Sequence, residues 1–435
     1  MDDRMRELEE IVRKQDAWRL GRTINLIASE NVLSRRARAL LPSDFNHRYA
    51  EGHPGARYYQ GTEFIDLVET KCREVMREIF GCSKAEVRTI SGTNANDVVW
   101  SALVGAGAKV FVNGLPAGGH ISHQKLGGVG KFTADIVEWP RLPDGFRIDV
   151  PKAKDLLARE RPKVVLFGRS LILFKEPVAE LAPVARELGA TVIYDGAHVL
   201  GLIGGKAFQD PLAEGAHVLM GSTHKTFPGP QRGVLLSNLD DDAWKKIDRT
   251  AFPGSLSNHH LMTLPPLLAT AYEFLAFGRE YARQIVANAK HLAKSLQAAG
   301  FAVAAADLGW TETHQVAVDV SAYGGGEPVA ERLKHHDIIC NRNQLPHDPP
   351  KKVRNPSGIR LGVQEMTRFG MKEAEMEEIA RIMKDCVIGA KDVKGEVNAF
   401  RSRWVDVHYS FDRPQAPPKP AAGSAEPIDV DMAGY

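Results

Sequence analysis

The chain has 435 residues, of which 43% are hydrophobic and 25% charged, and its formal net charge is +2. This length is enough for a large core and two domains, and the composition is ordinary for a globular protein. A net charge so close to zero predicts no general attraction to nucleic acid or to a membrane surface.

The four cysteines are Cys72, Cys82, Cys340 and Cys386. They form no C-x-x-C pair and no zinc-ligand pattern, which predicts free thiols in a reducing compartment. The histidine pairs at 259–260 and 335–336 have no acidic or cysteine partner at ligand spacing, so we expect no metal site. The N-terminus lacks a signal-peptide pattern and no run approaches about 20 apolar residues, so we expect a cytoplasmic protein.

The stretch from Asp3 to Leu20 predicts an amphipathic helix, because Met5, Leu8 and Val12 recur at helical spacing. The segment from Asn25 to Gln60 is different, since it is rich in Ser, Asn, Gly, Pro and Tyr and keeps no period for long. A loop of this length inside a globular protein is usually functional or a linker, and its histidine and tyrosines argue against a bare linker.

From about Ile65 onward, short β-rich runs alternate with helical stretches. The runs lie at 87–90, 110–112, 164–167, 191–194, 217–220 and 234–236. This alternation predicts an α/β fold with a mostly parallel sheet, helices on both faces, and an active site at the carboxyl ends of the strands. A long helix is expected from about Leu264 to Ala299, then strands at 316–318 and 338–339, and helices at 328–335 and 372–387.

We expect an N-terminal helical arm at 1–24, a large domain at 25–275 and a smaller C-terminal domain at 276–405. The last segment, 406–435, is rich in Pro, Ala, Gly and Ser towards its end and is predicted to be disordered.

A lysine and an aspartate follow two of the predicted strands. Lys225, in Ser-Thr-His-Lys-Thr, comes after the run at 217–220, where loss of water would lower its pKa and favour Schiff-base chemistry. A surface loop lysine explains this segment alone equally well. Asp195 follows the run at 191–194 and fits the acid that keeps a pyridine nitrogen protonated, although a helix N-cap explains an isolated Asp better.

Three other segments favour a cofactor and a carboxylate substrate. The sequence 91–96 opens a helix, where backbone N–H groups make an anion site, although many helices begin in this way. His120 would stack on a flat ring, although a lone histidine is more often structural. Arg360 lies inside an apolar strand, where a substrate carboxylate is a natural partner and an internal salt bridge is the common alternative.

The order and spelling of these segments resemble the fold-type-I pyridoxal-5′-phosphate (PLP) enzymes, and specifically the serine hydroxymethyltransferase (glycine hydroxymethyltransferase) family in a divergent or archaeal-type form. The strongest matches are Leu26-Ile27-Ala28-Ser29-Glu30-Asn31, Arg48-Tyr49-Ala50-Glu51-Gly52, Pro54-Gly55-Ala56-Arg57-Tyr58-Tyr59, Ala197-His198-Val199-Leu200-Gly201-Leu202-Ile203, Thr223-His224-Lys225-Thr226 and Ser357-Gly358-Ile359-Arg360-Leu361-Gly362. The resemblance spans roughly Asn25 to Val387. It implies a large domain with a mostly parallel, seven-stranded type of sheet, flanked by helices and joined to a smaller α+β domain.

The resemblance implies that Lys225 holds PLP as a Schiff base and that Asp195 pairs with the pyridinium nitrogen. The other implied cofactor contacts are Gly92 and Thr93 at the phosphate, His120 stacked on the ring, Ser170 and His198 near the ring oxygen, His224 before the lysine, and Tyr49, Ser257 and Asn258. Arg360, with Ser29 and Tyr59, is implied to bind the substrate.

Glu51 resembles the family's active-site glutamate, which comes from the neighbouring subunit together with the tyrosines that match Tyr49 and Tyr59. The resemblance therefore implies a homodimer, or a dimer of dimers, with shared active sites. Leu115, Gly119 and Asn343 match the pterin side of the pocket, next to Glu51.

The implied activity is one-carbon metabolism, the interconversion of serine and glycine with tetrahydrofolate or a related pterin as acceptor. The substrate carboxylate lies on Arg360 while the Cα–Cβ bond of serine breaks, and Glu51 manages protons on the hydroxyl or the pterin. The implied catalytic residues are Lys225, Glu51, Asp195, His198, His224 and Tyr59.

The chain departs from the family pattern near the phosphate and the folate. It reads Tyr58-Tyr59-Gln60-Gly61 for Tyr-Tyr-Gly-Gly, Gly229-Pro230-Gln231-Arg232-Gly233 for Gly-Pro-Arg-Gly-Gly, and Leu256-Ser257-Asn258-His259-His260 for a Gln-Gly-Gly turn, and the segment 169–173 is also unusual. Two alternatives stay open. One is a PLP aldolase or an α-methylserine hydroxymethyltransferase, and the other is a catalytically silent binding protein, against which Lys225 and Asp195 speak.

Overall fold

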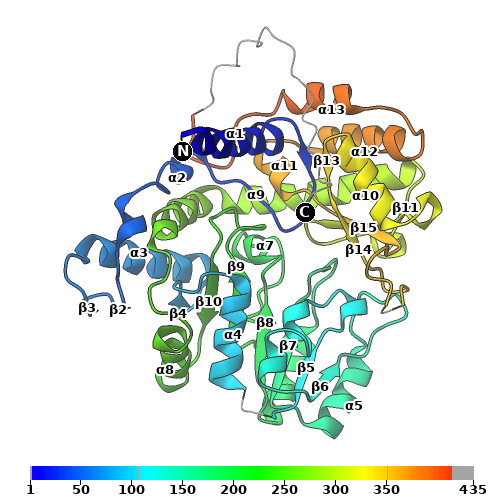
Figure 1. The fold of residues 1–435 in the computed structure, drawn as a ribbon. Coiled ribbons are helices and arrows are strands. Elements are labelled where there is room, and N and C mark those ends of the chain that lie inside the picture. The colour runs from blue at the N-terminus through cyan, green and yellow to red at the C-terminus, as the bar shows by residue number, and fades with distance from the viewer. Residues whose placement is uncertain (1, 105–106, 350, 414–435) are drawn as a thin grey trace.

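The computed structural model describes residues 2–104, 107–349 and 351–413. Its largest element is a seven-stranded sheet with the order β4-β10-β9-β8-β7-β5-β6 (Figure 1). The strands are β4 (Lys84–Glu86), β5 (Val110–Val112), β6 (Ile136–Glu138), β7 (Val164–Phe167), β8 (Thr191–Asp195), β9 (Val218–Ser222) and β10 (Gly233–Ser237). Neighbours from β6 to β9 are parallel, and β10 runs antiparallel to both of its neighbours. The predicted mostly parallel sheet is confirmed.

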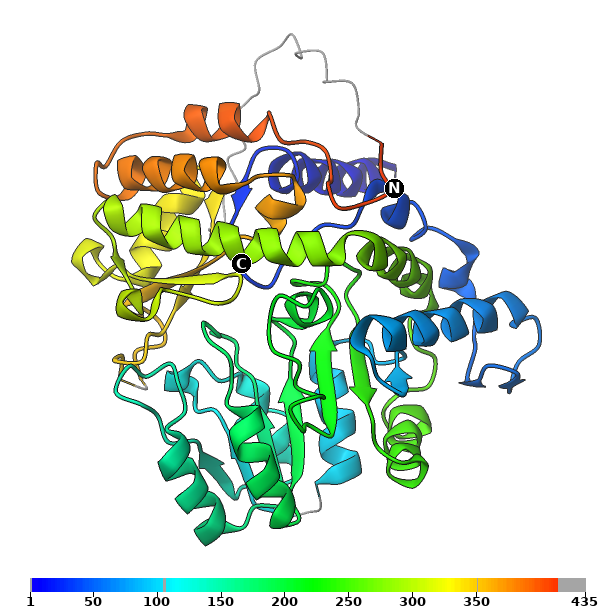
Figure 2. The ribbon, with the colours of Figure 1, turned by 180° about the vertical axis from the view of Figure 1, so that it is seen from behind.

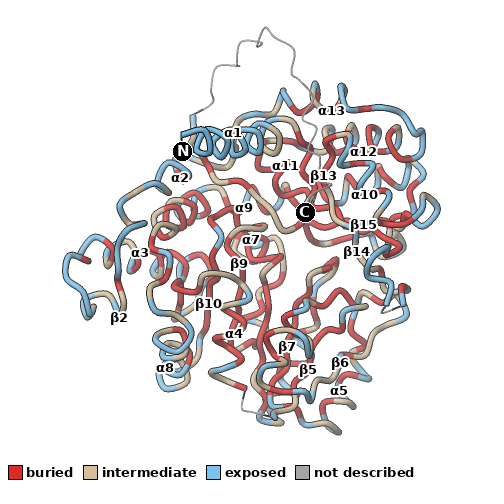
Figure 3. The backbone as a smooth tube through the Cα atoms, viewed as in Figure 1, coloured by how far each residue is buried: buried red, intermediate tan, exposed pale blue. Residues whose placement is uncertain are grey.

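Alternate residues of the strands point to opposite faces and join two different cores. Val165 and Phe167 pack with α3 (Glu63–Phe80), α6 (Val178–Glu187), α7 (Leu200–Gly204) and α9 (Leu264–Ala298). Val164 and Leu166 pack on the other face with α4 (Gly92–Leu103) and α8 (Asp241–Arg249). Nearly all residues of the central strands β5, β7, β8, β9 and β10 are buried (Figure 3), which is why these strands read as continuous apolar runs.

A second, antiparallel sheet has the order β11-β12-β15-β14. Its strands are β11 (Ala302–Val303), β12 (Gln315–Asp319), β14 (Asn341–Asn343) and β15 (Gly358–Gly362), and its helices are α10 (Gly326–His335), α11 (Gln364–Arg368), α12 (Glu373–Val387) and α13 (Lys394–Arg401). Helix α9 crosses from this part of the molecule to the seven-stranded sheet (Figures 1 and 2). The boundary predicted at 275/276 falls inside α9, and the division into domains stays a prediction.

The N-terminal part of the chain consists of an exposed helix and several short elements. Helix α1 (Asp2–Arg19) has no buried residue, and Met5, Leu8, Ile11 and Val12 are each more than half exposed. Strand β1 (Ile24–Asn25) pairs in parallel with β13 (Ile338–Ile339). The short helix α2 (Arg35–Arg38) and the hairpin of β2 (Gly52–His53) and β3 (Ala56–Arg57) follow, and the hairpin projects at one edge of the molecule (Figure 1).

Two expectations need correction. The strand expected at 87–90 lies instead at Lys84–Glu86, because the carbonyl oxygens of Val87 and Arg88 accept from the guanidinium of Arg232. The disorder predicted for 406–435 is wrong for residues 406–413, which are packed. Phe411 contacts Phe277, and the carboxylate of Asp412 accepts from the first amides of α2. The remainder of that predicted tail, 414–435, lies outside the described residues.

Within the described residues, the segment Leu261–Ala298 is long and apolar enough to cross a membrane by those two criteria alone. Core helices of globular proteins meet the same criteria, and 56% of the apolar stretch that meets them is buried against the rest of the chain.

Candidate active site

A cavity of about 170 Å³ lies at the carboxyl ends of β8 and β9, next to the first turn of α4. Its lining contains the predicted residues Gly92, Thr93, His120, Ser170, Asp195, His198, His224 and Lys225, together with Ser91, Asn96, Arg169, Ala197 and Ser222. The structure therefore brings together side chains from segments that are far apart in the sequence. The predicted position at the strand ends agrees with the general rule for parallel sheets.

Lys225 follows β9, and its backbone is fixed by Asn31, whose Nδ2 donates to the Lys225 carbonyl at 2.6 Å. Burial lowers the pKa of Lys225 to about 8, although the nearby Asp195 acts in the opposite direction. In the described part of the chain, no side chain forms a hydrogen bond or an ion pair with its Nζ. The amine is therefore both partly neutral near physiological pH and available to a ligand.

Asp195 ends β8, and both of its carboxylate oxygens have donors. Oδ2 lies 2.8 Å from Nε2 of His123 and accepts from Nδ2 of Asn96 at 3.0 Å, while Oδ1 accepts from the N–H of Ala197 at 2.9 Å. Burial alone would raise the pKa of Asp195, but these contacts hold it well below its usual range. A carboxylate that stays ionised is what a protonated pyridine nitrogen requires.

The contacts of His123 and Asn96 with Asp195 were not predicted from the sequence, although Asn96 lies in the candidate segment 91–96. His123 is fully buried and its ring lies 5.8 Å from that of His120, at the end of the short 3-10 helix Ile121–His123. The spacing of the two histidines was visible in the sequence, but nothing there indicated that the second one would meet Asp195 from a distant strand.

The first turn of α4 forms the end of the cavity that suits an anion. Ser91 caps the helix by accepting from the N–H of Asn94 at 3.0 Å, so the amides of the first turn point outward at the cavity wall. A Cβ on Gly92 would lie 2.3 Å from Oγ of Ser222, so a larger residue there would have to displace that hydroxyl. Thr93 and Ser222 add hydroxyl donors, and together these groups can bind a phosphate.

The imidazole rings at the cavity are neutral. Burial lowers the pKa of His120 to about 4 and that of His224 to about 4, with a further contribution to His224 from the charge of Lys225. Nδ1 of His120 lies 2.7 Å from Oγ of Ser122, which fixes the ring orientation. A neutral, flat and oriented ring is suited to stacking on a cofactor ring.

Arg360 lies on β15 of the second sheet and does not itself line the cavity, but it contacts Ser170, which does. Its Nη1 donates to the carbonyl of Ser170 at 2.7 Å and its Nε to Oδ1 of Asn341 at 3.1 Å. Burial lowers its pKa to about 10, which leaves it charged at neutral pH. Among residues 2–104, 107–349 and 351–413, no carboxylate pairs with Arg360, so the salt-bridge alternative fails.

Ser29 lies in an adjoining groove of about 500 Å³ rather than in the cavity itself, and the two spaces share His224. The segment that carries Ser29 is tied to the end of β15. The N–H of Gly362 donates to the carbonyl of Leu26 at 2.8 Å, and Nε2 of Gln364 donates to the carbonyls of Ile27 and Glu30, both at 2.7 Å.

Other predicted residues lie away from Lys225 but close to one another. The rings of Tyr49 and Tyr59 are 5.5 Å apart and partly exposed. Asn258 accepts from the N–H of Ala50 at 3.1 Å and donates to the carbonyl of Arg48 at 2.8 Å, which joins the predicted phosphate turn to the segment carrying Glu51. Neither these residues nor Glu51 and Ser257 line the cavity.

The three residues predicted for a pterin are divided between two elements near the cavity. Leu115 and Gly119 lie on the segment that leads to His120, and Leu115 is 39% exposed. Asn343 lies on β14, on the same strand as the Asn341 that contacts Arg360, and its Nδ2 donates to the carbonyl of Gln344.

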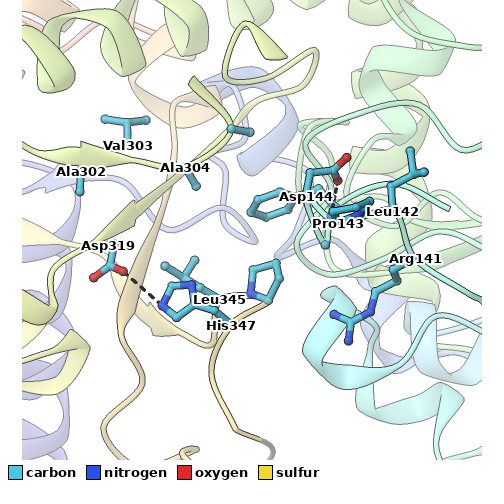
Figure 4. A pocket seen from close by; sticks show the side chains of 14 residues that line it. Arg141, Leu142, Pro143, Asp144, Ala302, Val303, Ala304, Asp319, Leu345 and His347 are labelled. Atoms are coloured by element: carbon cyan, nitrogen blue, oxygen red, sulfur yellow. Dashed lines mark hydrogen bonds and ion pairs between the residues drawn. The ribbon is translucent and has the colours of Figure 1, made fainter. Parts of the chain in front are cut away.

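A larger cleft of about 650 Å³ lies between residues 141–146 and the second sheet (Figure 4). His347 and Asp319 form an ion pair there at 3.2 Å, and the rest of the lining is mainly aliphatic or backbone. The lining contains no predicted site residue, so the cleft is not a candidate for the chemistry described above.

Comparisons with known proteins agree with this geometry. A sequence model of the family described as serine hydroxymethyltransferase matches residues 1–383. Relatives with that name include proteins from Sulfolobus acidocaldarius, 49% identical over 94% of this chain and 96% of theirs, and from Thermoplasma acidophilum, 49% identical over 90% and 92%.

A solved structure, L-threonine transaldolase from Pseudomonas fluorescens in its internal aldimine state, superposes with a TM-score of 0.84 at 27% identity, covering 95% of this chain and 96% of that one. It confirms the fold-type-I PLP architecture expected from the sequence. Because the family model and the relatives match most of the chain, the protein belongs to the serine hydroxymethyltransferase family.

Proposed function

We propose that the protein interconverts serine and glycine in a PLP-dependent reaction, with tetrahydrofolate or a related pterin as the one-carbon acceptor. The observation that carries the proposal is a pair of buried cations without acidic partners. Lys225 is available for a cofactor aldehyde inside the cavity, and Arg360 is available for a substrate carboxylate behind Ser170 of the cavity lining, close enough for its charge to act on Lys225. Leaving such cations unpaired costs stability, so a ligand is the natural partner.

The residues present fit PLP. The first turn of α4 with Ser222 suits the phosphate, His120 suits the ring face, and Asp195 suits the ring nitrogen. When bound, PLP acts as an electron sink for the bond that breaks at Cα of the amino acid.

The protein's own groups then have separate roles. Arg360 would bind the substrate carboxylate bidentately, with Ser29 as a helper, and so orient the bond to be broken. Lys225, with its pKa lowered to about 8, can release or accept a proton near neutral pH at the position next to Cα. His123 and Asn96 keep Asp195 ionised, and His224 lies next to Lys225 at the rim shared with the groove.

We further propose that Glu51, Tyr49 and Tyr59, with Ser257 and Asn258, complete the active site of a second copy of the chain in a homodimer or a pair of dimers. Their grouping on one partly exposed surface, away from Lys225 of the same chain, supports this arrangement. Glu51 would then manage protons on the substrate hydroxyl or the pterin, and Leu115, Gly119 and Asn343 would contact the pterin.

The transaldolase likeness favours one alternative, an aldol-type cleavage on the same Lys225, Asp195 and Arg360. The deciding experiment is to assay serine, α-methylserine and allo-threonine, each with and without tetrahydrofolate. Pterin-dependent cleavage of serine supports the main proposal. Serine cleavage that ignores every pterin would contradict it and favour the aldolase.

For the cellular setting we propose a reducing compartment such as the cytoplasm. The four cysteines are all free, which supports this proposal.

A further inference from the structure

Gln315, on β12, connects the second sheet to the cofactor cavity, and its side chain is fully buried. Its carboxamide contacts one loop of the other sheet, the segment that follows β7, at two points. Oε1 accepts from the N–H of Ile172 at 2.9 Å, and Nε2 donates to the carbonyl of Ser170 at 2.9 Å. The opposite orientation of the amide would set two acceptors against each other and two donors against each other. These contacts therefore fix which end of the amide is the donor.

Two imidazole nitrogens lie near the second hydrogen on Nε2 of Gln315, Nδ1 of His198 at 3.0 Å and Nε2 of His314 at 3.4 Å. Nε2 of His314 lies 3.1 Å from the carbonyl of Ala28, to which it can only donate, so the acceptor for Gln315 is His198. Because Nε2 of Gln315 is a donor, Nδ1 of His198 must be the acceptor and cannot carry a proton. Burial, together with the charges of Lys225 and Arg360, holds the pKa of His198 well below its usual value, so the ring is neutral. The single ring proton of His198 is therefore on Nε2.

Nε2 of His198 has no acceptor among the described residues, and the side chain lines the cavity. The backbone and the ring of His198 each have a further contact. The hydroxyl of Thr226 donates to the His198 carbonyl at 2.8 Å, and the ring of His314 is stacked at 5.8 Å. The arrangement leaves one oriented N–H donor directed at whatever occupies the cavity.

We propose that Gln315 is a positioning residue that fixes His198 as the Nε2–H tautomer, so that His198 presents a hydrogen-bond donor, and not an acceptor, to the ring oxygen of the cofactor. The same amide holds the Ser170 carbonyl, which also accepts from Arg360. Gln315 thereby joins the cofactor side of the site to the substrate-carboxylate side. The tautomer of His198 does not depend on the proposed PLP function. The hydrogen bond that His198 donates to the ring oxygen of the cofactor rests on that function.

The first test is neutron diffraction from crystals of the wild-type protein and of Gln315→Glu. We expect the wild type to carry hydrogen on Nε2 and none on Nδ1 of His198. The new carboxylate can only accept when ionised, so Nδ1 should acquire a proton in Gln315→Glu. Hydrogen on Nδ1 in the wild type, or the same tautomer in both proteins, would overturn the proposal. Either outcome is independent of whether the enzyme acts on serine.

The second test measures PLP binding and the absorbance of the bound cofactor across pH. In Gln315→Met, which keeps the length of the side chain, we expect about tenfold weaker PLP binding and a shifted pH midpoint of the absorbance. In a His198→Asn background, Gln315→Met should cause little further change, because the two residues act through one contact. Equal effects in both backgrounds would contradict the proposal.

A matched control separates positioning from general destabilisation. Asn288 is another fully buried amide, which donates to Thr367 and to the carbonyl of Met371, and it does not line the cavity. Asn288→Leu should lower the melting temperature without moving the absorbance midpoint. If the wild type took up no PLP at all, the proposed function would fail, while the tautomer result would still stand on its own.

Discussion

Lys225 and Arg360 are costly residues for the fold, because each loses water without gaining an acidic partner in the described part of the chain. Their positions were predictable, since Lys225 follows one apolar run and Arg360 lies within another. The residues that set the charge and orientation of the neighbouring side chains were not predictable. His123 and Gln315 belong to no predicted motif, and Asn96 lies in the segment 91–96 for a different reason; their contacts with Asp195 and His198 arise only when distant strands bring them together.

The pH dependence of the rate of cofactor binding should reflect the lowered pKa of Lys225. The neutral amine is the reactive form, and its fraction rises as pH increases through about 8, rather than through the ordinary lysine value of 10.5. The rate at which PLP absorbance develops in cofactor-free protein should therefore rise with pH and level off above about 9. A rate that continues to rise past pH 10 would show that the amine is not perturbed.

Removing His123 should change the acid limb of the activity profile. His123→Leu leaves Asp195 buried with only Asn96 and Ala197 as donors, so the pKa of Asp195 should rise. Activity then depends on a carboxylate that becomes protonated at higher pH than in the wild type, and the acid limb of kcat/KM should move towards neutral pH. An acid limb at the wild-type position would contradict the assigned role of His123.

At the scale of elements, the strands and long helices were predicted closely, because strands buried on both faces and helices packed on one face leave a strong apolar period. The expected helix at 372–387 is α12 (Glu373–Val387), for example. Short elements that depend on contacts between distant residues were not predicted. Strand β1 exists only through its pairing with β13, and β4 is displaced because Arg232 occupies the carbonyls of Val87 and Arg88.

Helix α11 offers a test of how the substrate segment is held. Both amide hydrogens of Gln364 bond carbonyls of the segment that carries Ser29. Gln364→Met keeps the side-chain length but removes both donors, so we expect KM for serine to rise about tenfold with kcat within about threefold. Asn288→Leu is the matched control, and it should reduce stability without changing KM. A fall in kcat at unchanged KM would contradict a role in holding the substrate segment.

At the scale of the whole molecule, one described chain does not bring Glu51 to its own Lys225 cavity. The apolar side chains exposed along α1 are consistent with further contacts between copies. Sequence resemblance alone predicted the shared site, because no local pattern can show which chain a loop will serve.

Coexpression of two inactive chains tests this arrangement. In a dimer of Lys225→Ala with Glu51→Ala, one of the two sites receives both intact residues. Random pairing should therefore restore about a quarter of the wild-type activity per site. The matched control pairs Lys225→Ala with the double variant Lys225→Ala/Glu51→Ala, which can form no intact site. Recovery no greater than in this control would mean that each chain completes its own site.

The pairing of β1 with β13 also has a consequence for folding during synthesis. Ile24 and Asn25 leave the ribosome early, but their partners Ile338 and Ile339 emerge more than three hundred residues later. Chains emerge at about 5–20 residues per second, so the segment carrying Ser29 waits tens of seconds for its support. The phosphate and pyridine ends of the cavity are complete once β10 has emerged. A nascent chain should therefore acquire its cofactor-binding walls well before its substrate-binding wall, and arrested chains of increasing length would separate the two events.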